Sequence, residues 1–325
     1  MIINVSNKLL YFIVFFAMFP FIANSQQDPY FSSYSFNPLL INTSLASLEK
    51  KNYATVIYRN QWTGYSSGSK SLGYDRGGSP ISKLLTVSLK NRNKKLSFGI
   101  NMSDDQLGPK SSFNISPFIA FKKKINSSLL SIGISPSIGS QTLHFDQFVF
   151  VDKTDPFNEV QGKQTEWQPD LDLGFSYSGD KLLLSLSINH LFRPSFNFNV
   201  ESLINRADIT YNVLAKYLIE IDRDLFIEPY ILFRSDLTSY TFDLSALASY
   251  KERIKIGTSY RYNEAVILFL GYSLLKENQL HLGYAFDYVI SNVKAKHLTS
   301  NELLIRYDLP MPQIKKPIRT PRFIY

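Results

Sequence analysis

Long segments of this chain alternate between apolar and small or polar residues, and this period of two constrains the fold more than any other feature. The segments 96–102, 130–139, 171–177 and 280–288 each carry apolar residues at every second position. Successive side chains of a β-strand point to opposite faces, so the pattern predicts strands with one apolar face. No segment of comparable regularity has the period of an amphipathic helix. The sequence therefore predicts an all-β protein.

The length of these segments separates the possible all-β classes. Strands of soluble β-sandwiches usually have about 5–6 residues, whereas a strand that spans a bilayer needs about 9–11. The alternating segments here mostly extend over about 9–15 residues, and their Leu, Ile, Phe and Tyr face would be a large exposed apolar patch in water. In a bilayer only a closed barrel satisfies all the backbone groups of such strands. We therefore predict a transmembrane antiparallel β-barrel of about 14 strands. The expected strands lie near 52–62, 83–91, 94–103, 111–125, 128–145, 167–178, 181–192, 208–221, 223–234, 238–250, 253–263, 265–275, 279–290 and 300–309.

The connections between the expected strands fall into two sets. One set consists of tight turns such as Ser178-Gly179-Asp180 and Asp222-Arg223-Asp224, and the other includes long connections near 63–82, 146–166 and 194–206. Outer-membrane barrels have short periplasmic turns and longer extracellular loops. Both chain termini are then expected on the periplasmic side.

The first 25 residues have the pattern of a secretory signal peptide. Lys8 precedes an apolar run from Leu9 to Ala23, and Ala23 and Ser25 are the small residues of a cleavage site. The alternative is a membrane anchor, but the run contains Pro20 and is shorter than the roughly 20 residues that a spanning helix needs. We expect cleavage near Ser25 and delivery to the outer membrane of a Gram-negative cell.

The formal charge of +8 does not indicate a nucleic-acid partner. Lys and Arg cluster at the expected tight turns, for example at Lys122–Lys124 and Lys251–Arg253, where they would lie in solvent beside lipid headgroups. The 20 Tyr and 25 Phe residues fit the aromatic girdles of an outer-membrane barrel in contact with lipid. No nucleic-acid-binding motif accompanies them.

The sequence contains no motif that indicates an enzyme or a cofactor. Cys is absent, which excludes disulfides and Cys-ligated zinc. The four His residues have no metal-ligand spacing, and there is no Gly-x-Ser-x-Gly elbow. The carboxylate pairs Asp104/Asp105 and Asp170/Asp172 are interpreted as solvated strand residues. We therefore expect a non-enzymatic protein without cofactor or metal. A hydrolase whose Ser and His meet only in space is the weakest alternative.

Four segments, in order along the chain, resemble the PorP/SprF family of outer-membrane proteins. The most specific are 27–42, with Asp-Pro, several aromatics and Asn-Pro, and 58–64, which reads Tyr-Arg-Asn-Gln-Trp-Thr-Gly. Residues 105–109 resemble the family's loop after its third strand, and 300–307 are similar to its closing strand. The resemblance implies a component of the type IX secretion and gliding-motility machinery of Bacteroidetes. It further implies periplasmic ring lipoproteins and a large secreted surface protein or adhesin as partners.

The resemblance carries over to twelve motif positions. They are Asp28, Pro29, Tyr34, Phe36, Asn37, Pro38, Asn42, Tyr58, Arg59, Gln61, Trp62 and Gly64. A periplasmic N-terminal segment of this kind, residues 26–51, could plug the lumen or brace the inner wall of the barrel at 52–309. Tyr58 and Arg59 would point to opposite faces of their strand. The alternative is that these residues fix the segment to the barrel without contacting a partner.

The last residues, 310–325, are basic and rich in Pro, which favours extended conformations. In the periplasm this tail could dock onto the ring lipoproteins, be unbound, or carry a barrel-assembly signal in its terminal aromatic. The candidate docking residues are Lys315, Lys316, Arg319, Arg322, Phe323 and Tyr325.

Two function classes remain open from the sequence. The first is secretion or surface anchoring of a large surface protein through protein–protein contacts. The second is a passive or ligand-specific outer-membrane transport channel, such as a porin or a fatty-acid channel.

Overall fold

The structure, a computed structural model, describes residues 29–65, 78–91, 93, 95–148, 162–198, 204–275, 278–291 and 297–310. These residues form a closed antiparallel barrel of fourteen strands, which confirms the predicted fold class. The predicted signal peptide, Asp28 and the docking residues of the tail lie outside the described residues. Among the described residues there is no helix with the length and hydrophobicity needed to cross a membrane.

The N-terminal part forms three short 3₁₀ helices, and the barrel follows. The helices are η1 (Ser32–Ser35), η2 (Pro38–Leu40) and η3 (Thr43–Ser47). The first strands are β1 (Asn52–Asn60), β2 (Ile81–Lys90), β3 (Leu96–Leu107), β4 (Lys110–Ile125), β5 (Ser128–His144), β6 (Lys163–Ser178) and β7 (Leu182–Asn189), with η5 (Phe145–Gln147) after β5. They are followed by β8 (Ser195–Asn197), β9 (Ile204–Arg206), β10 (Thr210–Tyr217), β11 (Ile219–Glu220), β12 (Leu225–Ser235), β13 (Tyr240–Tyr250), β14 (Ile254–Arg261), β15 (Ala265–Leu274), β16 (Leu280–Val289) and β17 (Thr299–Leu309).

The barrel has no free seam between its first and last strands. β1 pairs with β17 along its whole length, from Asn52 opposite Leu309 to Asn60 opposite Asn301. β10 pairs with both β7 and β12, and the short β11 continues the pairing with β12. β10 and β11 thus act as one interrupted strand. Closure satisfies the backbone groups that an open sheet would expose at its edges.

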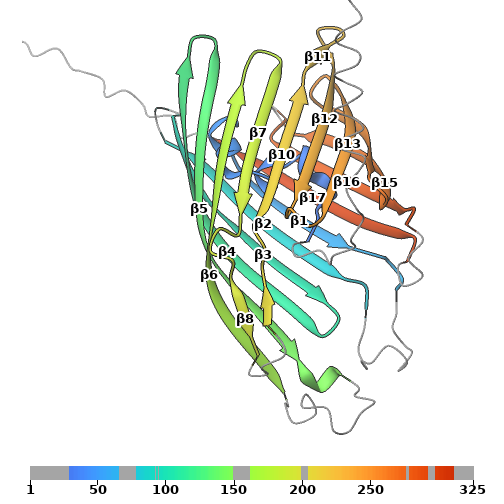
Figure 1. The fold of residues 1–325 in the computed structure, drawn as a ribbon. Helices are drawn as coiled ribbons and strands as arrows, with labels where there is room; N and C mark the ends of the chain where they lie inside the picture. The colour runs from blue at the N-terminus through green and yellow to red at the C-terminus, as the bar shows by residue number, and fades with distance from the viewer. Residues whose placement is uncertain are drawn as a thin grey trace, which may run out of the picture.

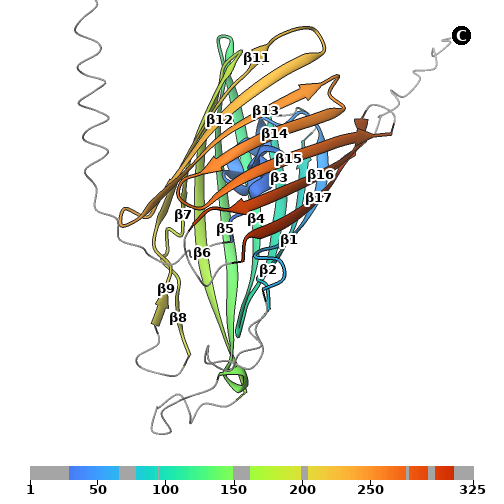
Figure 2. The ribbon, with the colours of Figure 1, turned by 90° about the vertical axis from the view of Figure 1, so that its right-hand side faces the viewer.

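The two ends of the barrel differ, as Figures 1 and 2 show. The tight turns after β4, β6 and β11 lie at one end, which we call the tight-turn end. The strand ends joined by the long connections lie at the other, the long-loop end, together with η5 and a small hairpin of β8 and β9. The hairpin has no sequence signal strong enough to be predicted, because each of its strands has three residues.

Two strands at the long-loop end are longer than expected. β3 continues to Leu107 and β6 begins at Lys163, so the predicted strands at 94–103 and 167–178 were too short there. Residues 105–107 of the third family-like segment therefore lie in β3 and not in a loop, and the turn is limited to Gly108 and Pro109. Gly108 has a φ of 57°, a left-handed conformation that suits glycine.

The outer face is mostly apolar, and part of the inner face is apolar as well. In β15, Val266, Leu268 and Leu270 are exposed, whereas Ile267 and Phe269 are buried in the interior. A water-filled lumen would be lined by polar residues. The apolar inner residues therefore require a partner inside the barrel.

Candidate functional site inside the barrel

The partner is the N-terminal segment, residues 29–48, which lies within the barrel against its inner wall. Figures 1 and 2 show it in blue, surrounded by strands in the half nearer the tight-turn end. Its Phe31, Tyr34, Phe36, Ile41 and Leu45 form one core cluster with inward-facing residues of the wall. The ring of Phe36 meets that of Phe269 edge to face, with the ring centres 6.2 Å apart. Burial of this apolar surface on both sides stabilises the segment in the lumen.

A buried ion cluster holds the start of the segment. Arg59, only 2% exposed, places Nη2 2.7 Å from Asp287 Oδ2 and Nη1 3.0 Å from Glu302 Oε2. The same Glu302 carboxylate accepts the backbone N–H of Ser32 at 2.8 Å and that of Ser33 at 2.9 Å. We call Arg59, Asp287 and Glu302 the carboxylate clamp. It joins β1, β16 and β17 to η1 through charge-assisted hydrogen bonds.

The aromatic residues around η1 contact a second set of buried charges. The Tyr34 hydroxyl lies 2.6 Å from Ser245 Oγ. The guanidinium carbon of Arg234 lies 4.3 Å from the ring centre of Tyr30, a cation–π distance. Arg261 is fully buried and donates to Asp243 through Nε and Nη2. Burial raises the pKa of Tyr34, so its hydroxyl is neutral and available as a hydrogen-bond donor.

Asn42 holds the other end of the segment. Its side chain caps η3 by accepting Ser44 N at 2.8 Å, and its Nδ2 donates to the carbonyl oxygens of Phe175 and Leu186 at 3.1 and 2.8 Å. These carbonyls belong to β6 and β7, so one amide bonds two neighbouring strands of the wall. Ser44 Oγ and Ser47 Oγ add contacts of 2.5 and 2.6 Å with Ser176 and Ser131.

Two glycines make this contact sterically possible. A Cβ on Gly133 of β5 would lie 2.5 Å from Ser44 N, and one on Gly174 of β6 would lie 1.8 Å from Asn42 Oδ1. The two glycines are direct cross-strand neighbours. The segment therefore packs against the bare backbone of the wall.

The remaining candidates of the N-terminal motif also lie in the lumen. Asn37 is fully buried; its Nδ2 donates to Thr86 at 3.3 Å and its Oδ1 accepts from the Tyr53 hydroxyl at 3.3 Å. Pro38 begins η2, where a proline costs no hydrogen bond. Pro29 precedes η1 and is half-buried. Ile41 O accepts a hydrogen bond from Ser187 at 2.8 Å.

The second family-like segment is divided between the lumen and the long-loop rim. Arg59 belongs to the lumen, whereas Tyr58, its neighbour on β1, is 39% exposed on the outer face. Gln61, Trp62 and Gly64 form the turn that follows β1; Trp62 N donates to Ser300 Oγ at 3.0 Å. The structure thus brings Arg59 together with the N-terminal motif and leaves the other four residues apart from it.

An acid-sensitive contact fixes the end of the segment. Glu49 Oε2 lies 3.0 Å from Arg306 Nη2. Burial by itself raises the pKa of Glu49, but Arg306 outweighs it and the net pKa lies below the ordinary value of 4.5. A carboxyl with a lowered folded-state pKa contributes stability above its unfolded-state pKa, and this contribution is lost as the pH falls through the folded-state value.

We therefore expect Glu49→Gln to reduce the loss of stability on acidification below pH 4.5. The measurement is the urea midpoint of unfolding of the detergent-solubilised barrel, compared with that of the unmodified protein at pH 7 and at several values below 4.5. Equal acid losses in both proteins would contradict this role of Glu49.

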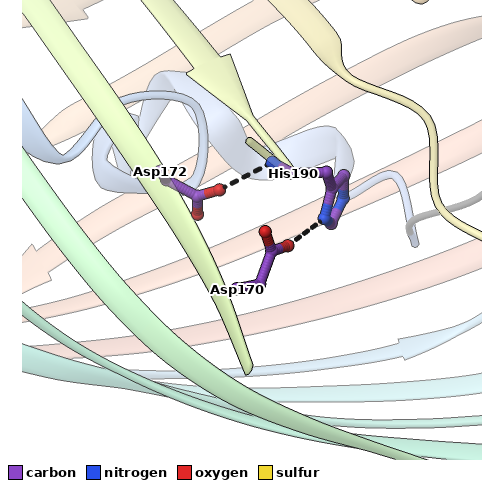
Figure 3. A group of neighbouring side chains, drawn as sticks. All are labelled: Asp170, Asp172 and His190. Carbon is purple, nitrogen blue, oxygen red and sulfur yellow. Dashed lines mark hydrogen bonds and ion pairs between the residues drawn. The ribbon is translucent and has the colours of Figure 1, made fainter. Parts of the chain in front are cut away.

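One group of side chains has the composition of a metal site. Asp170, Asp172 and His190 each offer a ligand atom within 4.8 Å of the others. Asp170 Oδ2 pairs with His190 Nδ1 at 2.5 Å, and Asp172 Oδ1 accepts the backbone N–H of His190 at 3.1 Å; Figure 3 draws both contacts. Asp170 Oδ1 also accepts Phe192 N at 3.3 Å, and His190 has a φ of 59°. Asp170 and Asp172 lie on β6, and their bonds hold the turn at His190 that follows β7. The three residues therefore have a structural role.

The spatial meeting of these residues was not predicted from sequence. Asp170 and Asp172 were interpreted as solvated, yet Asp170 is buried and both bond His190. The strand pairing that brings residue 190 beside 170 and 172 cannot be seen from the spacing of the residues alone.

A closed barrel with an apolar outer face and its own N-terminal segment in the lumen has the fold of an outer-membrane β-barrel protein. The family model described as type IX secretion system membrane protein PorP/SprF matches residues 23–307. The chain belongs to this family. A comparison with curated proteins finds no match.

Solved barrels with the same fold are distant in sequence. The Ralstonia pickettii toluene transporter TbuX is 8% identical, with a TM-score of 0.52 over 84% of this chain and 93% of that one. The P. putida toluene transporter TodX is 9% identical, with a TM-score of 0.51 over 85% and 95%. The monoaromatic hydrocarbon channel CymD is 8% identical, with a TM-score of 0.52 over 84% and 92%. At these identities the likeness shows the fold alone.

Sequence reasoning missed the wall residues that receive the segment, namely Asp287, Glu302, Gly133 and Gly174. A signal for them does exist. Asp287 and Glu302 are acidic at inward positions of strands, and residues 265–270 are apolar on both faces. The inward apolar residues of 265–270 depart from the simple rule of a polar inside and an apolar outside, and Asp287 and Glu302 add inward charges beside them.

Proposed function

We propose that this protein is a non-enzymatic outer-membrane component of the type IX secretion machinery that helps to secrete or anchor a large surface protein. Membership of the PorP/SprF family supports the machinery, and the N-terminal segment lodged in the lumen supports a role other than solute conduction. The carboxylate clamp, the Asn42 contacts and the apolar core together fix the N-terminal segment in the lumen. The segment acts as a resident plug.

The orientation follows from the two ends of the barrel. The tight-turn end faces the periplasm and the long-loop end faces outward, as in other outer-membrane barrels. The tight turns and the basic tail then contact the ring lipoproteins in the periplasm. The large surface protein binds at the long loops. The carboxylate clamp and Asn42 hold the plug, and Asp170, Asp172 and His190 hold the turn after β7. This use of them supports a role without catalysis.

The experiment that tests this proposal is purification of the protein from its own outer membranes in mild detergent, followed by mass spectrometry. The tag is inserted in the long connection between β1 and β2 so that both termini stay free. Recovery of ring lipoproteins together with one large surface protein is the expected result. A variant truncated after Pro310 is the matched test of the tail and is expected to lose the lipoproteins alone.

The second candidate function is transport, suggested by the barrel shape shared with TbuX and TodX. It predicts conductance or solute uptake by the purified barrel without any partner. Recovery of the barrel alone, with pores of measurable conductance in planar bilayers, would overturn the secretion proposal and favour the channel.

A further inference from the structure

The outer face carries a concave apolar groove over β4, β5, β6, β7 and β10. It has a volume of about 580 Å³, within the range of about 300–1,000 Å³ of small-molecule sites. Its walls include the exposed side chains of Phe121, Ile132, Phe175, Leu184 and Val213. A barrel surface is generally convex and touches a lipid chain on one side. This groove offers contact on several sides of a chain.

The floor of the groove is fixed from the inside. Ser131, Ser176 and Ser185 line it, and their hydroxyls bond the plug. Ser131 Oγ donates to Ser44 O at 2.7 Å, and Ser185 Oγ accepts from Asn42 Nδ2 at 2.7 Å. The wall here is a single layer of strands packed against η3. The floor of the groove is therefore held by buried hydrogen bonds to the plug and does not depend on an occupant.

A cation lies at one end of the groove. Lys123 is one of its lining residues, is exposed, and lies on β4 between the outward-facing Phe121 and Ile125, close to the turn at Asn126 and Ser127. At the same end the Tyr177 hydroxyl lies 2.9 Å from Ser128 Oγ. A ring of aromatic hydroxyls and lysines is typical of the headgroup level of a barrel. The apolar part of the groove then lies in the adjoining acyl region.

We propose that this groove binds one acyl chain of an anionic phospholipid in the leaflet at the tight-turn end, with Lys123 Nζ on the phosphate. Both the bound and the free lipid are in an apolar medium, so transfer from water contributes nothing to specificity. Close packing of the acyl chain and the lysine–phosphate contact favour binding of the lipid in the groove over binding elsewhere on the outer face of the barrel. The apolar lining and the single cation at its end match a chain attached to an anionic headgroup.

The test is native mass spectrometry of the delipidated full-length barrel titrated with phosphatidylglycerol. We expect one lipid to bind more tightly than the rest. Lys123→Ala is expected to weaken it about fivefold, the equivalent of about 1 kcal/mol for one basic residue at a membrane surface. Leu184→Trp, which fills the groove from its wall, is expected to abolish the tight site.

Two matched controls keep the result interpretable. Leu268→Trp makes the same change on the outer face of β15, and Lys83→Ala removes an exposed lysine near the long-loop end; both should bind the tight lipid normally. Absence of a tight lipid in the unmodified barrel, or its retention in Leu184→Trp, would overturn the proposal. Equal binding of a neutral diacylglycerol would overturn the role of Lys123.

Discussion

Arg59→Ala is expected to destabilise the barrel by about 3–5 kcal/mol, because it leaves the carboxylates of Asp287 and Glu302 buried without their counter-ion. Both are 1% exposed, and Arg59 is the cation that pairs with each of them. Glu302 also accepts hydrogen bonds from the backbone of η1, so the variant should weaken the attachment of the start of the plug as well. The measurement is the urea midpoint of unfolding, followed by the heat-dependent gel shift of the folded barrel.

The matched control is Lys83→Ala. The Lys83–Asp104 pair has the same 3.0 Å separation as the Arg59–Glu302 pair, but its side chains are 57% and 48% exposed. An exposed pair is worth about 0–1 kcal/mol, so this variant should unfold nearly as the unmodified protein does. Similar losses in the two variants would show that burial of the clamp is not what makes it important.

A second variant separates the plug from the wall. Glu302→Ala leaves Arg59 paired with Asp287 but removes the acceptor for Ser32 N and Ser33 N. If the clamp holds the plug, this barrel should conduct ions in planar bilayers. A barrel that is closed in both Arg59→Ala and Glu302→Ala would contradict that role.

Gly133→Ala is expected to displace η3 from the wall while leaving the barrel intact. The new Cβ would lie 2.5 Å from Ser44 N and 2.8 Å from Ser44 Cα. These are backbone atoms and cannot move aside as the end of a flexible side chain can. Overpacking of this kind costs about 1–3 kcal/mol, which corresponds to a roughly 5- to 150-fold increase in the displaced population.

The readout uses the absence of natural cysteine. A single Ser47→Cys reporter in η3 is fully buried in the native plug, so a maleimide should label it slowly until η3 leaves the wall. Gly139→Ala is the matched control: it lies on the same strand and face, and the nearest atom to its Cβ is 3.5 Å away. Equal labelling rates in the two alanine variants would show that the close approach at Gly133 does not position η3.

The fold could be predicted because barrel formation depends on local patterns that repeat many times. The two-residue period, the strand length and the difference between the two sets of connections each indicate the same architecture, and small errors at single strands do not change it. In the barrel strands the errors lie mainly at strand ends, and outside them the hairpin of β8 and β9 was not predicted. β3 continues through 105–107, where the resemblance to the family implied a loop, because the neighbouring β4 supplies a complete ladder of partners there.

The candidate site was less accessible to sequence reasoning. Two polar residues of the motifs, Arg59 and Asn42, lie at contacts that hold the N-terminal segment, but their partners Glu302, Phe175 and Leu186 are more than 130 positions away in the chain. A strand pattern states which residues face inward. It does not state which of them meet across the lumen.

The sequence by itself therefore determined that this chain forms a membrane-spanning barrel with an unusual N-terminal segment, because both follow from the order of residue types along the chain. Only the tertiary structure decided that residues 29–48 lie inside the barrel, with Arg59 between two carboxylates and η3 against Gly133 and Gly174. The physical reason is closure. It brings β1, β16 and β17 together around one interior, and the buried charges and bare backbone there acquire their roles only when the segment lies against them.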